Sequence, residues 1–147
     1  MEPVKKVSDA LGFAGQPTPE DLKQAAAQGF KSVLNLRSPS EANTLSDEQQ
    51  HAEAAGLRYA TVPLSPSSPD DALVHQALEE LENLPQSVLL HCGAGARAGG
   101  LALIATAMQE NLTKDQLIDR AQQLGISLDQ PHLKQFLATH YGNDASG

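Results

Sequence analysis

The sequence has no tryptophan, only 3% aromatic residues and a single cysteine among 147 residues. The core must therefore be packed from aliphatic side chains. A lone cysteine forms neither an internal disulfide nor a multi-cysteine metal site. No apolar run approaches the roughly 20 residues of a membrane helix, and residues 1–13 lack the apolar segment of a secretory signal. We therefore expect a cytoplasmic protein with a free thiol and no membrane partner.

Positive charge is also scarce, because 10 Lys and Arg residues face 18 Asp and Glu residues, giving a net charge of -8. Such a surface repels phosphate backbones, so no nucleic-acid partner is expected. The length fits one domain with its own core. We predict a single domain over residues 1–142 and a frayed tail over 143–147. The sequence indicates no oligomeric state.

Apolar and alternating runs recur between segments of helical pattern. Strands are predicted over residues 30–37, 57–64 and 86–91. Helices are predicted over residues 19–28, 47–55, 70–83, 101–110, 114–124 and 130–141. This alternation predicts an α/β fold in which helices flank a mainly parallel sheet of about four strands. Residues 86–91 are apolar enough to form the central strand.

Several local patterns mark helix starts and close contacts. Ser46 with Gln49 and Thr113 with Gln116 have the spacing of capping boxes. The pair Gly99–Gly100 lies near a predicted helix start, where each glycine costs about 1 kcal/mol against alanine. We interpret this pair as a close approach of the chain to a neighbouring strand or to a ligand.

The segment HCGAGAR, residues 91–97, directly follows the most apolar predicted strand. Ligands of parallel sheets bind where a strand gives way to a helix. Gly93, Ala94, Gly95 and Ala96 have almost no bulk, so their N–H groups can converge on one anion. Arg97 adds a planar fork for two oxygens, and the same field favours the thiolate of Cys92. The pattern predicts nucleophilic attack on a tetrahedral oxyanion or a sulfur donor; a small buried cysteine beside a plain turn is the alternative.

These residues resemble the His-Cys, glycine-containing loop and Arg of the cysteine-dependent phosphatases of the protein tyrosine and dual-specificity class. Upstream, AGQPTPEDLKQAAAQGFKSVLNLR resembles the small bacterial phosphatase-like family often labelled beta-lactamase-hydrolase-like. The likeness runs from residue 12 to about residue 124. It implies a cysteine-phosphatase-like fold acting on a phosphorylated protein or a small-molecule phosphomonoester, without a cofactor.

The resemblance also implies a role for each matching residue. Cys92 would attack phosphorus and form a phosphocysteine, which water then hydrolyses. Arg97 and the amides of residues 93–97 would hold the equatorial oxygens. His91 would orient the loop and help to keep the cysteine ionised.

Some features leave other functions open. Four residues separate Cys92 from Arg97, whereas most of the phosphatase class has five. Four is also the spacing typical of rhodaneses, in which the cysteine carries a persulfide. Ala98 stands where a Ser or Thr usually helps to expel the thiolate, which suggests slow turnover or a non-catalytic phosphate-binding module. Asp70 and Asp71 are the nearest candidates for a general acid, yet both fit the first turn of a helix.

The remaining charged residues give weaker indications. Arg37 ends a predicted strand and either reaches the rim of the cysteine loop or is solvated. The histidines outside the loop have no metal-ligand spacing, so we expect no metal and a surface role for each of them; they are His51, His75, His132 and His140. The scarcity of lysine favours a phosphomonoester with little further charge, such as phosphotyrosine or an aryl phosphate.

Overall fold

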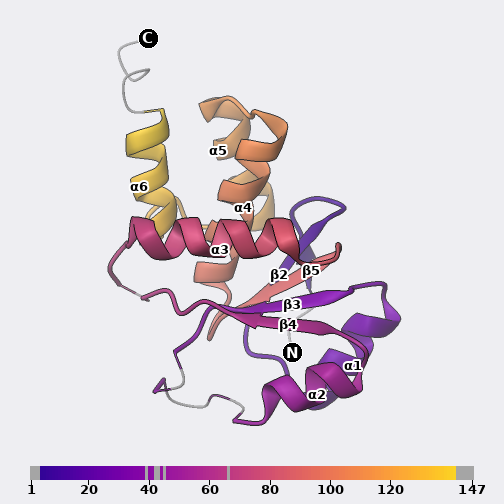
Figure 1. Cartoon of the computed structure of the whole chain (residues 1–147). Coiled ribbons are helices and arrows are strands. Elements are labelled where there is room, and N and C mark those ends of the chain that lie inside the picture. The colour runs from indigo at the N-terminus through magenta and orange to yellow at the C-terminus, as the bar shows by residue number, and fades with distance from the viewer. Residues whose placement is uncertain (1–3, 39, 42–43, 45, 66, 142–147) are drawn as a thin grey trace.

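A computed structural model describes residues 4–38, 40–41, 44, 46–65 and 67–141 (Figure 1). The expected frayed tail lies outside these residues. The strands are β1 (Lys5–Lys6), β2 (Leu11–Ala14), β3 (Ser32–Asn35), β4 (Arg58–Thr61) and β5 (Val88–His91). The helices are α1 (Pro19–Ala27), α2 (Glu48–Ala54), α3 (Asp71–Asn83), α4 (Ala96–Glu110), α5 (Lys114–Leu124) and α6 (Pro131–His140).

One sheet joins the five strands in the order β1-β2-β5-β3-β4. Strands β2, β5, β3 and β4 run parallel, and only β1 is antiparallel to its neighbour. The α/β class and the central place of β5 are confirmed. The described residues form five strands where about four were expected. The three predicted ranges correspond to β3, β4 and β5, whereas no range was predicted for β1 or β2. Strand β1 is a pair of exposed lysines, and β2 is four buried residues with no alternation.

The register brings the carboxyl ends of three strands together. His91, the last residue of β5, pairs with Ala14 of β2 on one side and with Asn35 of β3 on the other. Segments that leave these strands therefore start from the same edge of the sheet. This edge is where a ligand site is expected in a parallel sheet.

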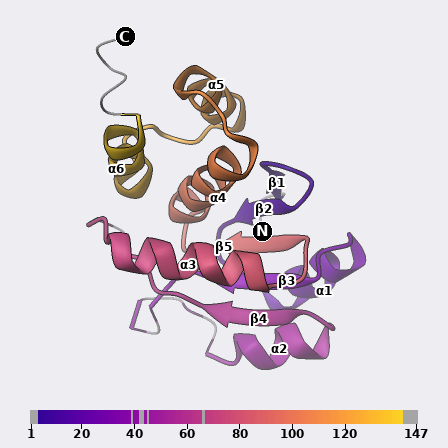
Figure 2. The same cartoon turned by 45° about the horizontal axis from the view of Figure 1, so that its top comes forward.

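Helices cover both faces of the sheet, with α1 and α2 on one face and α3 to α6 on the other (Figure 2). Alternate residues of the strands supply the two cores. Val33 and Leu89 belong to the smaller core beneath α1 and α2. Leu34 and Leu90 belong to the larger core, which α4 fills with a run of buried residues from Arg97 to Ala107. No helix in the described ranges is long and apolar enough to cross a membrane.

The expected helix starts are partly confirmed. Thr113 and Gln116 form the predicted capping box. The capping box at Ser46 and Gln49 is wrong, because α2 begins at Glu48 without a side-chain cap. The carboxylate of Glu48 is instead buried against His91, and this tertiary contact fixes the start of the helix.

Helix α4 begins five residues earlier than expected, so Gly99 and Gly100 lie inside it. The predicted close approach to a neighbouring strand is confirmed at Gly99, whereas Gly100 approaches the start of helix α6 instead. A Cβ atom at Gly99 would lie 3.0 Å from the ring of Phe13 on β2. A Cβ atom at Gly100 would collide with the side chain of Gln130, which accepts the Leu133 N–H at the start of α6. These glycines let α4 lie close to both neighbours.

Gly100→Ala is expected to lower the free energy of unfolding by about 1–3 kcal/mol, because the added methyl group overpacks the contact with Gln130. This loss should exceed the gain of about 1 kcal/mol that alanine brings to a helix. Urea denaturation measures the change. Gln122→Ala, on the exposed side of α5, serves as the control and should stay within about 0.5 kcal/mol of the wild type. A more stable Gly100→Ala protein would contradict the close approach.

Candidate active site

The thiol of Cys92 lies at the carboxyl end of β5 and is almost fully buried, with 1% of the residue exposed. The backbone N–H groups of Gly95 and Ala98 donate to its sulfur at 3.1 and 3.4 Å. Gly95 has φ +100°, which lets the loop turn tightly into α4. The amino end of α4 therefore points at sulfur, and its dipole favours negative charge there.

Arg97, in the first turn of α4, is buried below the loop. Its Nη1 donates to the carbonyl oxygens of Leu64 at 2.8 Å and Leu36 at 3.3 Å. Both carboxylate oxygens of Glu41 accept from the guanidinium at 2.9 Å. The hydrogen bond with Glu41 raises the pKa of Arg97, and the charge of Cys92 raises it further. Arg97 thus touches both the thiol and a carboxylate.

The carboxylate of Glu41 accepts hydrogen bonds from two arginines, Arg37 and Arg97. The hydrogen bond from Arg97 is the main reason that its pKa falls to about 2. Arg37, which follows β3, also donates to Glu41 through Nε at 3.1 Å. A Cβ atom at Gly93 would lie 3.7 Å from the guanidinium groups of both arginines. Of the two interpretations of Arg37, the structure therefore supports the one in which it reaches the rim of the loop.

His91 is completely buried at the end of β5 and pairs with Glu48 at the start of α2. The distance from His91 Nε2 to Glu48 Oε2 is 2.5 Å. Gln16 donates to the other carboxylate oxygen of Glu48 at 2.6 Å and accepts from Arg37 at 2.8 Å. Burial alone raises the pKa of Glu48, but the hydrogen bond and charge of His91 outweigh it and hold the pKa below its usual value.

A cavity of about 770 Å³ adjoins the outer side of the cysteine loop. Most of its lining residues are small, and the lining comprises Lys5, Phe13, Ala14, Gly15, Gln16, Gly93, Ala94, Gly95, Ala96, Gly125, Ile126 and Ser127. Gln16 therefore contacts both this space and the buried carboxylate of Glu48. The cavity leaves room for a small molecule beside the loop.

The two candidate acids both have structural partners. Asp70 caps α3 by accepting from the N–H of Leu73 at 3.2 Å. Asp71 accepts from the amide of Gln135 on α6 at 2.5 Å. The interpretation of these carboxylates as first-turn residues is therefore confirmed.

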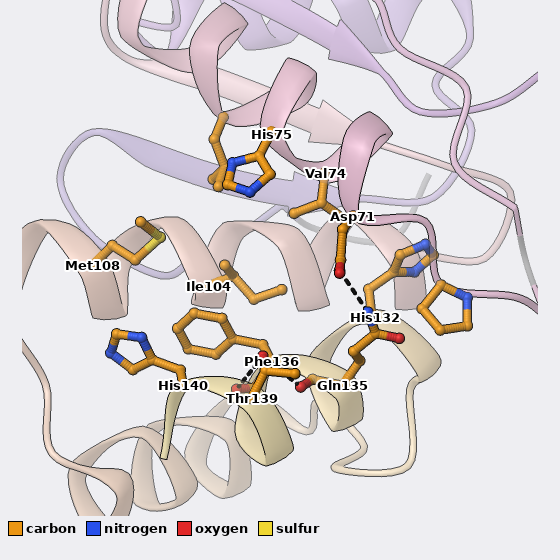
Figure 3. A pocket seen from close by; sticks show the side chains of 12 residues that line it. Asp71, Val74, His75, Ile104, Met108, His132, Gln135, Phe136, Thr139 and His140 are labelled. Atoms are coloured by element: carbon orange, nitrogen blue, oxygen red, sulfur yellow. Dashed lines mark hydrogen bonds between the residues drawn. The ribbon is translucent and has the colours of Figure 1, made fainter. Parts of the chain in front are cut away.

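Three of the four histidines outside the loop lie around one cavity on the α4 side of the sheet, whereas His51 lies on α2. His132 is 2% exposed, so the expected surface role is wrong for this residue. Gln130 donates to its Nδ1 at 3.0 Å. His132 lines a separate cavity of about 270 Å³ between α3, α4 and α6, whose rim carries His75 and His140 (Figure 3). Within the described part of the chain, no group of three His, Cys, Asp or Glu residues is arranged to hold a metal.

Sequence reasoning missed the three residues that connect the loop to its surroundings, which are Gln16, Glu41 and Glu48. Each comes from a segment far from Cys92 in the chain. Only Glu41 carried a signal, because an acid four residues after a strand-ending arginine can pair with it. The other two depend on the register of β2, β3 and β5.

Replacing Glu41 by Gln should lower the free energy of unfolding by about 1–3 kcal/mol at pH 7, because two buried arginines lose their anion. The unfolded carboxyl has a pKa of 4.5 and the folded one about 2, so the unfolded state binds more protons between these values. The wild-type advantage is therefore complete above pH 4.5 and declines as the pH falls toward 2. Urea denaturation across this range measures it, with the exposed Glu110→Gln as control. An advantage that does not vary with pH would contradict the ion pair.

Comparison with known proteins agrees with this geometry. Residues 3–109 match the family described as beta-lactamase hydrolase-like protein, phosphatase-like domain. A beta-lactamase hydrolase-like protein of Agrobacterium fabrum is 29% identical over 128 residues, which are 84% of this chain and 29% of that protein. The chain thus spans less than a third of the length of this curated relative.

Solved structures share the fold over most of both chains. The DUF442 protein of Shewanella putrefaciens has a TM-score of 0.78 at 21% identity, covering 95% of this chain and 89% of its own. The core catalytic domain of SIW14, a PP-IP phosphatase of S. cerevisiae, has a TM-score of 0.71 at 22% identity, with coverages of 97% and 90%. The match over residues 3–109 makes this chain a member of the beta-lactamase hydrolase-like phosphatase-like domain family, with the fold of the cysteine phosphatases.

Proposed function

We propose that this protein is a cysteine-dependent phosphatase that hydrolyses phosphomonoesters of the phosphotyrosine or aryl phosphate type. The observation that carries the proposal is the convergence on one sulfur atom of two backbone N–H donors and the guanidinium of Arg97. Donors fixed in this way stabilise charge without having to reorganise during the reaction. A lone thiol stays reduced in the cytoplasm, where we place the reaction.

The proposed reaction has two steps. The thiolate of Cys92 attacks phosphorus and forms the P–S bond, while the P–O bond to the leaving group breaks and the leaving oxygen takes up a proton. Water then attacks phosphorus, the P–S bond breaks, and inorganic phosphate and the thiolate are released. Residues 93–97 would hold the equatorial oxygens through their amides, with the guanidinium of Arg97 beside them.

The surroundings favour a substrate with a good leaving group and little further charge. Asp70 and Asp71 are already held by structural partners, and aryl oxygens depart without a strong acid more easily than alkyl oxygens. Near the loop, Arg37 and Arg97 face Glu41 and Glu48, so their charges balance. SIW14 is by its name a PP-IP phosphatase. A substrate with several phosphate groups would need more cations than Arg37 and Arg97 supply beside this loop.

Two further functions each have one observation in their favour. The four residues between Cys92 and Arg97 suit a sulfurtransferase in which the cysteine carries a persulfide. Ala98, which has no hydroxyl, suits a module that binds phosphate without turnover.

One paired assay separates the three functions. Wild type and Cys92→Ser are given an aryl phosphate and, separately, thiosulfate with cyanide. We expect phosphate release by the wild type alone and no thiocyanate from either protein. Asp119→Asn, an exposed change on α5, is the matched control and should retain full activity. Thiocyanate formation without phosphate release would favour the sulfurtransferase, and inactivity in both assays together with vanadate binding would leave the binding module.

Ala98 offers a second test of the two-step reaction. Its N–H lies 3.4 Å from the sulfur of Cys92 and its side chain is buried. We expect wild type to release one equivalent of aryl alcohol in a burst, followed by slow turnover. Ala98→Ser should speed the slow phase about tenfold, because one hydrogen bond to the departing thiolate is worth roughly 1.4 kcal/mol. Stopped-flow absorbance measures both phases. Ala138→Ser, an exposed change on α6, should change neither phase. A burst-free wild type would argue against a rate-limiting second step.

A further inference from the structure

A second cavity, of about 270 Å³, lies between α3, α4 and α6 (Figure 3). The residues that line it are all different from those that line the cavity beside the cysteine loop. An apolar cavity of about 150 Å³ is large enough to hold a benzene molecule. The second cavity therefore has room for a molecule with one or two rings, and the proposed phosphatase reaction makes no use of it.

Apolar and aromatic groups line one end and the middle of this cavity. Met108 and His140 lie at that end, and Val74 and Ile104 lie between the two ends (Figure 3). Met108 is 47% exposed, and no other large hydrophobic side chain of the described residues is exposed. The ring of Phe136 stacks on that of His140, with their centroids 4.7 Å apart. Thioether and aromatic groups of this kind pack well against a planar ring.

The opposite end of the cavity is polar. Asp71 of α3 accepts from the side-chain amide of Gln135 of α6 at 2.5 Å, and this hydrogen bond joins the two helices there (Figure 3). Among the described residues, the carboxylate of Asp71 forms no ion pair with a basic side chain. Its second oxygen can therefore accept a hydrogen bond from a ligand.

His132 lies at the same polar end and is 2% exposed. The amide oxygen of Gln130 accepts from the N–H of Leu133, so the amide nitrogen of Gln130 donates to Nδ1 of His132 at 3.0 Å. Burial lowers the pKa of His132, so the ring is neutral at pH 7 and its proton is on Nε2. Nε2 has no hydrogen-bond partner among the described residues. A buried N–H without an acceptor is unfavourable, and native proteins normally supply one.

The two polar groups together restrict the class of ligand. A protonated amine would satisfy Asp71 but would give the N–H of His132 no acceptor. A carboxylate would accept from His132 but would be repelled by Asp71, and no Lys or Arg is among the described residues that line the cavity. An uncharged ring with an acceptor beside a donor satisfies both groups. Adenine, with a ring nitrogen next to its amino group, has this pattern on its edge.

We propose that the cavity between α3, α4 and α6 binds an uncharged nitrogen heterocycle of the nucleobase class. A ring nitrogen of the ligand accepts from Nε2 of His132, and its amino group donates to Asp71. The faces of the ligand pack against the apolar groups around Ile104. Binding at this cavity does not depend on the phosphatase reaction, because Cys92 and the cysteine loop take no part in it.

Isothermal titration calorimetry at pH 7 tests the proposal with 9-methyladenine and with 9-methylpurine, which lacks the amino group. We expect wild type to bind one equivalent of 9-methyladenine and to bind 9-methylpurine about tenfold less tightly, because one hydrogen bond is lost. Asp71→Ala should bind the two ligands equally. Asp115→Ala, which removes the exposed first-turn carboxylate of α5, is the matched control and should retain the preference of the wild type.

His132→Phe keeps an aromatic ring but removes the N–H, and it should bind 9-methyladenine about tenfold less tightly than wild type. If this variant does not fold, the comparison at the exposed Asp71 decides alone. A wild type that does not bind 9-methyladenine, or that binds both ligands equally, would overturn the proposal. Loss of binding in Cys92→Ser would also overturn it, because the ligand would then lie at the cysteine loop.

Discussion

The buried guanidinium of Arg97 is the group on which the arrangement of this edge of the sheet depends. A cation out of water must have its donors satisfied, and here the acceptors come from three separate segments. Leu36 follows β3 and Leu64 follows β4, and each supplies a backbone carbonyl oxygen. Glu41 comes from the connection between the two strands. Any displacement of these segments leaves a buried donor without an acceptor, which costs several kcal/mol for a charged group. The cysteine loop is therefore held from below by electrostatics as well as by packing.

The whole molecule and its candidate site differ in charge. The chain carries a net charge of -8, whereas Arg37 and Arg97 balance Glu41 and Glu48 around the loop. Under the proposed function, an approaching phosphate would gain little from long-range attraction. Its affinity would come from short-range donors, chiefly the loop amides. Such a site would select by geometry, since a group that does not fit the loop would gain almost no compensation for losing its water.

Local chemistry in the sequence was enough to predict the central parts of the molecule. The position of β5 and of the cysteine loop could be predicted from three neighbouring signals. These are an apolar strand, a loop of tiny residues and an arginine, each within a few residues of the next. Strand β2 gave no such signal. All four of its residues are buried, so its sequence shows neither an alternation of apolar and polar residues nor a long apolar run. Glu48 and Gln16 likewise depend on strand register, which no local pattern encodes. Asp70 was correctly interpreted as a cap because capping is local. His132 was misjudged because its burial depends on how α6 docks onto α4.

The scarcity of aromatic residues has a practical side. With no tryptophan present, near-ultraviolet absorption comes mainly from Tyr59 and Tyr141. Each phenol has its own partner, Asn35 for the first and the carbonyl oxygen of Leu112 for the second. Tyr59 packs against the smaller core near Glu48, whereas Tyr141 packs into the larger core. The protein therefore carries two built-in optical reporters, one on each side of the sheet, and a chromophore need not be added to distinguish events at the two layers.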